Sequence, residues 1–151
     1  MEKLKRIALV AHDDRKDDLV DWVRANHAAL QPHRFWSTGT TGRRVREACP
    51  KLDVSLLKSG PLGGDQQLGA RIAEGLIDVL IFFIDPLSPM PHDVDVKALT
   101  RLSTLYNVAS ATNRATADFL IASPLFEQTY HAPTGGGDGE PAVSPARNGT
   151  E

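Results

Sequence analysis

Two carboxylates and a histidine, carried by two separate loops, could perform acid–base chemistry. Asp65 stands in the glycine-rich turn KSGPLGGDQQ, and His92 and Asp95 stand in the segment DPLSPMPHDVD. A carboxylate can abstract a proton, and a histidine can hydrogen-bond an oxygen on which negative charge develops. The alternative is ordinary helix-start chemistry, in which a carboxylate in the first turn is stabilised by the helix dipole.

A second group of residues is suited to binding a phosphate ester. Glycines let backbone N–H groups approach an anion at a helix start, hydroxyls add donors, and a lysine supplies a point charge. The candidates are His12, Lys16, Thr38, Gly39, Thr40, Thr41, Ser59 and Gly60. The alternatives are a capped turn, with Thr40 or Thr41 as the N-cap, and a solvated polar turn around Lys16. The turn STGTTG is neither GxGxxG nor a Walker A motif, so neither a dinucleotide nor ATP is indicated.

The same residues could in principle bind a metal ion. His12, Asp65, His92 and Asp95 would supply enough ligands if they converged. The neighbouring turns rich in glycine and hydroxyl groups, STGTTG and KSGPLGGDQQ, are called the phosphate-type turns below. Together with Lys16 they favour an organic anion instead. We therefore expect no metal site.

The elements that must position these residues alternate along the chain. Five runs are predicted to be strands, of which 6–11 and 78–84 are the most apolar: 6–11, 34–38, 54–58, 78–84 and 108–111. Between and after them, helical spacing is found in 17–26, 41–48, 64–74, 93–106 and 113–122. This alternation predicts one α/β domain of three layers, a mostly parallel five-stranded sheet with helices on both faces. Because ligands bind outside the carboxyl ends of such strands, the polar turns that follow the strands should share one crevice.

Composition divides the 151 residues into two parts and excludes several classes of protein. Residues 1–130 form the expected domain, whereas 131–151 contain eight Gly or Pro and are predicted to be a disordered tail. The net charge of −2 argues against nucleic-acid binding. The single Cys49 excludes an intramolecular disulfide, and the longest apolar runs are too short for a bilayer. A cytoplasmic protein without a membrane partner is expected.

Several motifs in a fixed order carry a family resemblance. They are IALVAHDDRK, TGTTG, SGPLGGDQQLGARIAEGLIDVLIFFIDPL, PHDVDVKALTRL and ATNRATADFLI. From about Ile7 to about Phe126 the chain closely resembles the methylglyoxal synthase family. The resemblance implies conversion of dihydroxyacetone phosphate to methylglyoxal and phosphate without a metal or organic cofactor. It also implies a compact α/β sandwich, a homohexamer and allosteric inhibition by inorganic phosphate.

The resemblance also implies roles for individual residues. Asp65 matches the catalytic base, His92 the group that contacts the reacting oxygens, and Asp95 a second active-site carboxylate. The eight phosphate-type candidates match substrate- and phosphate-binding positions. One departure is that the family normally continues with a strand and a helix bearing an arginine, which the Gly/Pro-rich residues 131–151 replace.

Two other classes of protein compete with an enzyme. One is a regulatory domain of the same fold, such as the effector-binding end of carbamoyl phosphate synthetase. The other is a phosphate-sensing protein, which needs the phosphate-binding turns but no base. Asp65, His92 and Asp95 together favour the enzyme.

Overall fold

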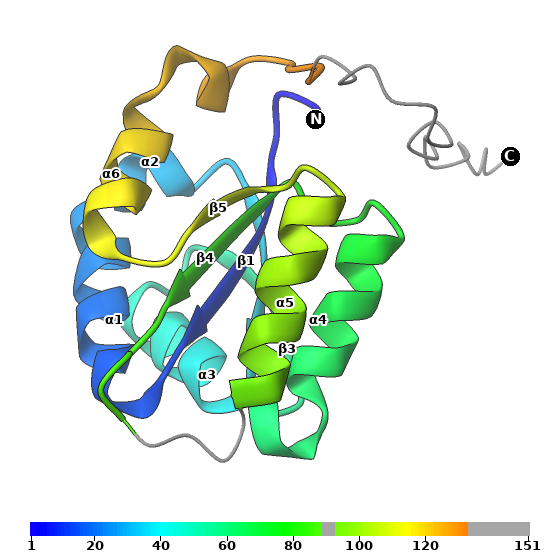
Figure 1. Ribbon diagram of the computed structural model, residues 1–151. Coiled ribbons are helices and arrows are strands. Elements are labelled where there is room, and N and C mark those ends of the chain that lie inside the picture. Colours follow the sequence, from blue (N-terminus) through cyan, green and yellow to red (C-terminus); the bar gives the residue numbers. More distant parts are fainter. Residues whose placement is uncertain (89–92, 133–151) are drawn as a thin grey trace, which may run out of the picture.

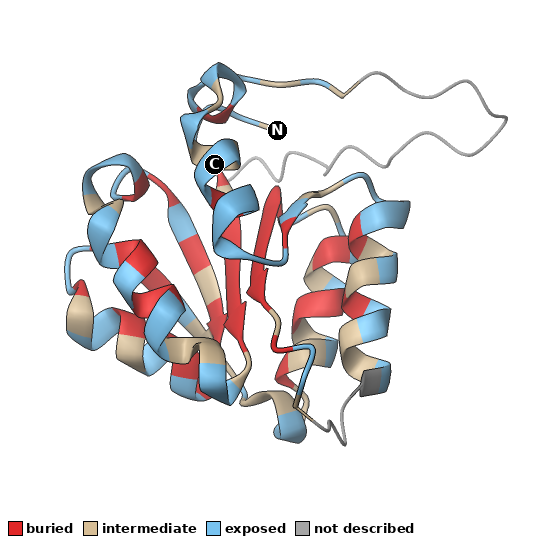
Figure 2. Cartoon of the chain, turned by 60° about the vertical axis from the view of Figure 1, so that its left-hand side comes forward, coloured by how far each residue is buried: buried red, intermediate tan, exposed pale blue. Residues whose placement is uncertain are grey.

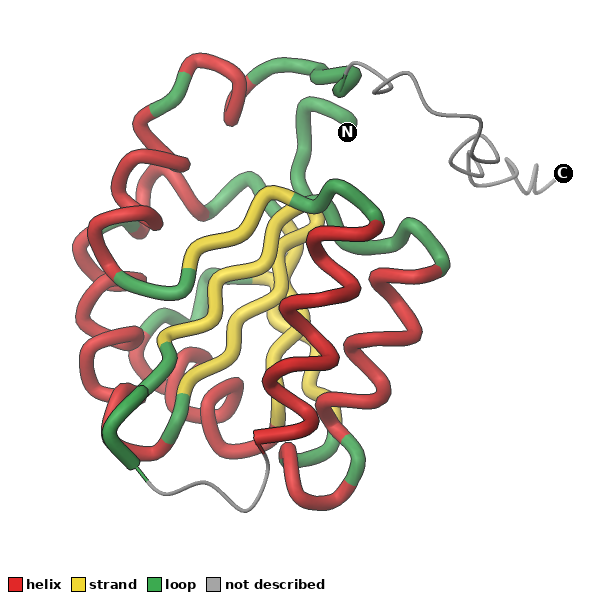
Figure 3. Tube along the Cα trace, viewed as in Figure 1, coloured by secondary structure: helices red, strands yellow, loops and turns green. Residues whose placement is uncertain are grey.

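Five parallel strands form the centre of the structure, a computed structural model that describes residues 1–88 and 93–132 (Figures 1 and 3). The strands are β1 (Arg6–Ala11), β2 (Arg34–Thr38), β3 (Asp53–Leu57), β4 (Val79–Phe83) and β5 (Ala109–Ala111). They lie in the order β3-β2-β1-β4-β5, and each neighbouring pair is parallel. The predicted five-stranded α/β sheet is confirmed, and it is parallel throughout.

Helices cover both faces of this sheet and complete the three layers. They are α1 (Lys16–Ala25), α2 (His27–Leu30), α3 (Gly39–Ala48), α4 (Gly64–Ala73), α5 (Asp93–Leu105) and α6 (Arg114–Ala122). Helices α1, α3 and α6 pack on one face, and α4 and α5 pack side by side on the other. The short α2 and three 3₁₀ turns, Asp13–Arg15, Gly60–Leu62 and Pro124–Glu127, were not predicted from the sequence.

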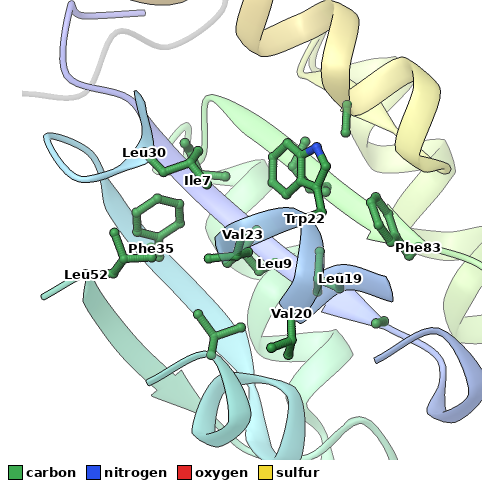
Figure 4. Packing of buried hydrophobic residues seen from close by; sticks show 14 of the residues in the cluster. Ile7, Leu9, Leu19, Val20, Trp22, Val23, Leu30, Phe35, Leu52 and Phe83 are labelled. Carbon is green, nitrogen blue, oxygen red and sulfur yellow. The ribbon is translucent and has the colours of Figure 1, made fainter. Parts of the chain in front are cut away.

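The centre of the sheet is buried on both faces because the two central strands, β1 and β4, are apolar at nearly every position. Every residue of β4 is buried, and Figure 2 shows the buried residues concentrated in the strands and on the inner sides of the helices. On the α1 face, Trp22 is fully buried beside Phe83, at a centroid distance of 6.1 Å (Figure 4). Its indole N–H donates to the Asp118 carboxylate at 2.8 Å, so this large ring is buried without leaving a polar group unsatisfied.

Hydrogen bonds join the first and last described residues near the amino ends of the strands. The buried Lys5 ammonium donates to the carbonyl oxygens of Glu2 and Gln128, at 2.5 and 2.6 Å. Met1 and Tyr130 exchange two further main-chain bonds of 2.8 and 2.9 Å. The packed body therefore reaches Tyr130. The predicted disordered tail, 131–151, lies outside the described residues from position 133 onward.

The strand order creates a topological switch point at the opposite end of the sheet, where the carboxyl ends of the strands lie. The chain moves outward from β1 through β2 to β3 with α1 and α3 on one face, then returns to β4 and β5 with α4 and α5 on the opposite face. The connections that leave β1 and β4 therefore diverge to opposite faces. The carboxyl ends of β1 and β4, where the connections diverge, are the place at which α/β sheets bind ligands.

Candidate active site

The turn between β2 and α3 is held in contact with the turn between β3 and α4. The Gly39 N–H donates to the Lys58 carbonyl at 3.2 Å. A Cβ atom at Gly39 would lie 2.9 Å from the Ser59 Cα, so this approach requires glycine. Two of the predicted phosphate-type turns, containing Thr38–Thr41 and Ser59–Gly60, are thus neighbours at the carboxyl edge.

The start of α3 differs from the capped turn considered as the alternative. The helix begins at Gly39 with Thr38 as its N-cap residue, and no side chain caps it. Neither Thr40 nor Thr41 is the cap, so that interpretation is wrong. Thr38 and Thr41 are buried and Thr40 is exposed. The N–H groups of the first turn therefore have no side-chain cap, and a helix start of this kind attracts anions.

The turn that precedes α4 places Asp65 beside Gly60. Gly63 adopts a left-handed conformation with φ of 102°, and the Gly64 N–H donates to the Ser59 carbonyl at 2.9 Å. A Cβ atom at Gly64 would lie only 1.9 Å from the Lys58 carbonyl oxygen. A Cβ atom at Gly60 would lie 3.2 Å from an oxygen of the Asp65 carboxylate. The absence of side chains at these glycines lets the Asp65 carboxylate lie directly against the phosphate-type turn.

Asp65 and Asp95 line one groove, although they come from different helices. The groove has a volume of about 350 Å³ and lies between α4 and α5, with Leu99 and Leu102 also lining it. The Gln66 amide donates to the Asp95 carboxylate at 2.7 Å, which links the starts of the two helices. The structure thus brings together two of the three residues predicted to be catalytic. The third, His92, lies outside the described residues.

Lys16 lies at the start of α1 and contacts a carboxylate. Its ammonium is 2.6 Å from the Asp13 carboxylate, and the Lys16 side chain is only 15% exposed whereas that of Asp13 is 93% exposed. The hydrogen bond from Lys16 lowers the pKa of Asp13. An incoming phosphate would have to share the Lys16 ammonium with Asp13 or displace it.

His12 follows the last residue of β1, at the switch point. Its main-chain N–H donates to the Phe83 carbonyl at 3.1 Å, and its ring lies edge-on to Phe82. The Nδ1 atom accepts a hydrogen bond of 2.8 Å from the Asp85 main-chain N–H. Burial lowers the pKa of His12, although the Asp85 and Asp65 carboxylates oppose this shift.

Three residues that contact the candidate site were given no role by the sequence analysis: Asp13, Gln66 and Asp85. Each makes its contact with a predicted site residue through tertiary packing or a local turn, which no motif encodes. Of the three, only Asp85 could have been suggested by the sequence. It directly precedes Pro86, and an Asp–Pro pair favours a turn.

A second, larger hollow lies between α1 and α3 and is unsuited to an anion. It has a volume of about 540 Å³, and its lining alternates carboxylates with guanidinium groups: Asp17, Val20, Asp21, Arg24, Arg44, Glu47 and Ala48. Arg44 is already paired with Asp17. Three acidic groups against two basic ones leave no excess of positive charge for a phosphate.

The fold and the turns at its carboxyl edge define an MGS-like α/β domain. The family described as "MGS-like domain" matches residues 18–112. The crystal structure of methylglyoxal synthase from Elizabethkingia anophelis NUHP1 superposes with a TM-score of 0.81. It is 49% identical and covers 86% of this chain and 85% of its own.

Curated relatives agree with this assignment. Methylglyoxal synthase of Oleidesulfovibrio alaskensis is 57% identical over 130 residues, which are 86% of this chain and 88% of the relative. Methylglyoxal synthase of Brucella ovis is 60% identical over 121 residues, which are 80% of this chain and 97% of the relative. The chain belongs to the methylglyoxal synthase family, as its sequence motifs indicated.

The helices were also compared with the length and hydropathy that a bilayer requires. Among residues 1–88 and 93–132, none of them is both long and apolar enough to cross a membrane.

Proposed function

We propose that this chain is a methylglyoxal synthase, a carbon–oxygen lyase that converts dihydroxyacetone phosphate to methylglyoxal and inorganic phosphate. The observation that carries the proposal is the Asp65 carboxylate against Gly60, in a turn that touches the uncapped start of α3. A base therefore lies next to backbone suited to a phosphate ester. Membership of the methylglyoxal synthase family supports the same reaction.

The first step is abstraction of a proton by Asp65. The proton leaves the hydroxymethyl carbon, which adjoins the ketone, and the electron pair of the C–H bond moves toward the ketone oxygen. The resulting enediolate carries charge on oxygens that hydrogen-bond donors must stabilise. We assign this stabilisation to His92, and we assign Asp95 as a second active-site carboxylate.

The second step is elimination of phosphate. The hydroxyl on the former hydroxymethyl carbon gives its proton to the neighbouring enediolate oxygen and becomes an aldehyde carbonyl, the electron pair of the carbon–carbon double bond shifts to the next carbon–carbon bond, and the bond between the far carbon and the phosphate oxygen breaks with its electron pair leaving on phosphate. The enol that remains tautomerises to methylglyoxal by taking a proton at carbon. Phosphate is held first as an ester and then as a leaving group, so its binding groups must stabilise both states.

The phosphate-binding groups are proposed to come from three turns. Backbone at Gly39 and Gly60 suits an anion because neither glycine carries a side chain, although the Gly39 N–H itself already donates to the Lys58 carbonyl. The hydroxyls are those of Thr38, Thr40, Thr41 and Ser59, and Lys16 and His12 supply the remaining donors. Lys16 is the charged group among them, and a charge-assisted bond is about twice as strong as a neutral one.

Assembly, regulation and location follow from the family resemblance. We propose a homohexamer that inorganic phosphate inhibits, in the cytoplasm. Leu62 and Leu87 are 72% and 88% exposed beside the site, and contact between subunits would cover such apolar side chains. Cys49 is a free, buried thiol, as a reducing compartment allows.

An assay of phosphate release from dihydroxyacetone phosphate tests the proposal. The unmodified protein should release phosphate and methylglyoxal in equal amounts. Asp65→Asn keeps the shape of the side chain but removes the proton acceptor, so turnover should fall by about 10²–10⁴-fold. Glu74→Gln, the same kind of change at the other end of α4, is the matched control and should retain turnover.

Two outcomes would contradict the proposal. Absence of turnover by the unmodified protein, with phosphate still bound, would favour the phosphate-sensing or regulatory alternative. Turnover by Asp65→Asn close to that of the unmodified protein would remove Asp65 as the base.

A further inference from the structure

The imidazole of His12 is fixed in one orientation by the main chain of a different loop. The Asp85 N–H donates to Nδ1 at 2.8 Å, across the switch point between β1 and β4. A ring nitrogen that accepts a hydrogen bond carries no proton. When the ring is neutral, the proton is therefore on Nε2.

The other ring nitrogen is buried and unsatisfied. Among the described residues, His12 Nε2 is one of two buried side-chain nitrogen or oxygen atoms without a hydrogen-bond partner. The ring packs edge-on to Phe82, with centroids 5.1 Å apart and planes inclined by 78°. A buried donor to which the described residues offer no partner is available to hydrogen-bond a bound molecule or an ordered water.

Asp85 is the residue that holds this arrangement. Asp85 is buried, at 8% exposure, and its carboxylate accepts a hydrogen bond from the Leu87 N–H at 3.1 Å. An aspartate that bonds the main chain two residues on forms a local Asx-type turn. This turn sets the direction of the Asp85 N–H, and that N–H in turn sets the tautomer of His12.

We propose that Asp85 is a positioning residue that holds His12 as a neutral Nε2–H donor aimed at a substrate oxygen. The inference rests on the proposed function for the identity of that oxygen. The Asp85 side chain touches no reacting atom in this scheme and acts through His12. A neutral donor polarises an oxygen by hydrogen bonding but transfers no proton from an imidazolium.

The charges around the ring decide whether it stays neutral. Three carboxylates face it: Asp85 from the loop after β4, Asp65 from α4 and Asp13 from its own turn. All three favour the imidazolium, whereas burial opposes it more strongly and lowers the pKa of His12. Protonation would also place a proton on Nδ1 and break the bond from the Asp85 N–H. Acid should therefore remove the donor geometry and reduce turnover.

Nitrogen-15 NMR of the ligand-free full chain reads the tautomer directly. The chain has five histidines, so His12→Gln identifies the signals of His12. The unmodified protein should show an unprotonated Nδ1 and a protonated Nε2, and this state should persist below pH of about 6.5, the ordinary histidine pKa. A protonated Nδ1 on neutral His12, or an imidazolium already dominant at that pH, would overturn the proposal.

Two variants separate the acceptor of Asp85 from its charge. Asp85→Ala removes the acceptor for the Leu87 N–H, so His12 should become a mixture of tautomers and kcat should fall about tenfold, the effect of one hydrogen bond. Asp85→Asn keeps an acceptor oxygen, so it should restore the single tautomer and most of the lost kcat. Because the Asn variant removes a negative charge, the titration midpoint of His12 should move lower still.

The readouts distinguish this proposal from the proposed function. The tautomer is measured without substrate, so it is decided even if dihydroxyacetone phosphate is not turned over. A loss of kcat in Asp85→Ala with the tautomer unchanged, or no rescue in Asp85→Asn, would show that Asp85 has only a structural role. A midpoint that rises in Asp85→Asn would contradict the assigned charge environment.

Discussion

The close approach of Gly64 to the Lys58 carbonyl gives a sharp test of how Asp65 is positioned. In Gly64→Ala the new Cβ would lie 1.9 Å from that oxygen, whereas real Cβ contacts essentially never fall below 3.0 Å. The two groups must therefore separate by about 1 Å. The clashing group is the main-chain carbonyl of Lys58, which cannot rotate away as a side chain can. Because Gly64 directly precedes Asp65, the clash must displace Asp65.

The magnitude follows from this displacement. A misplacement of about 1 Å at a reacting group costs about 10²-fold in rate, and overpacking of this kind typically costs about 1–3 kcal/mol of folding stability. We therefore expect kcat for phosphate release to fall about 100-fold while the protein remains folded. The assay measures phosphate release at saturating substrate, together with urea unfolding of the same preparation.

A matched substitution in the same helix provides the control. A Cβ atom at Gly69 would lie 3.1 Å from Leu102 Cδ1, the end of a flexible side chain that can move aside. Alanine also favours the helix interior by up to about 1 kcal/mol relative to glycine, so Gly69→Ala should keep both turnover and stability. Normal turnover in a folded Gly64→Ala protein would refute the argument that this backbone contact positions Asp65.

Three further predictions concern binding, pH and the end of the chain. Lys16→Ala should weaken binding of inorganic phosphate about 10- to 150-fold, whereas Asp13→Asn, which frees the ammonium from an exposed pair, should strengthen it by up to about fivefold. Isothermal titration of phosphate measures both, and a weaker affinity in Asp13→Asn would contradict the competition. Burial lowers the pKa of His33, so below pH of about 6.5 the unfolded chain takes up a proton that folded His33 resists. The free energy of unfolding should therefore fall as pH decreases through that range, and it should fall less steeply in His33→Asn. Urea unfolding at several pH values measures this dependence. The same slope of unfolding free energy against pH in both proteins would refute the assignment. Truncation after Tyr130 should leave Tm unchanged, because 131–151 contain almost no large apolar side chains; a drop of several degrees in calorimetry would show that these residues pack on the body.

The sequence determined the architecture because the runs that form its two central strands, RIALVA and VLIFF, are apolar at successive positions, as in a sheet covered on both faces. The run Arg6–Ala11 was predicted with its observed bounds, and so was Arg34–Thr38. Alternation with helical spacing then required parallel strands. Boundaries were less accurate where glycine and threonine open a helix, and α3 begins at Gly39 rather than at Thr41. Intrinsic preferences there are overridden by the contact of Gly39 with Lys58.

The sequence also determined which residue types could act, since it places a carboxylate, hydroxyls and glycines in the turns that follow the strands. Only the tertiary structure decided how they meet. The bond from Asp85 to His12 and the contact of Gly39 with Lys58 depend on distances between loops that are far apart in the chain. Such distances follow from strand order and from backbone approach within a few tenths of an ångström. No local pattern of residues encodes them, because they result from packing of the whole sheet.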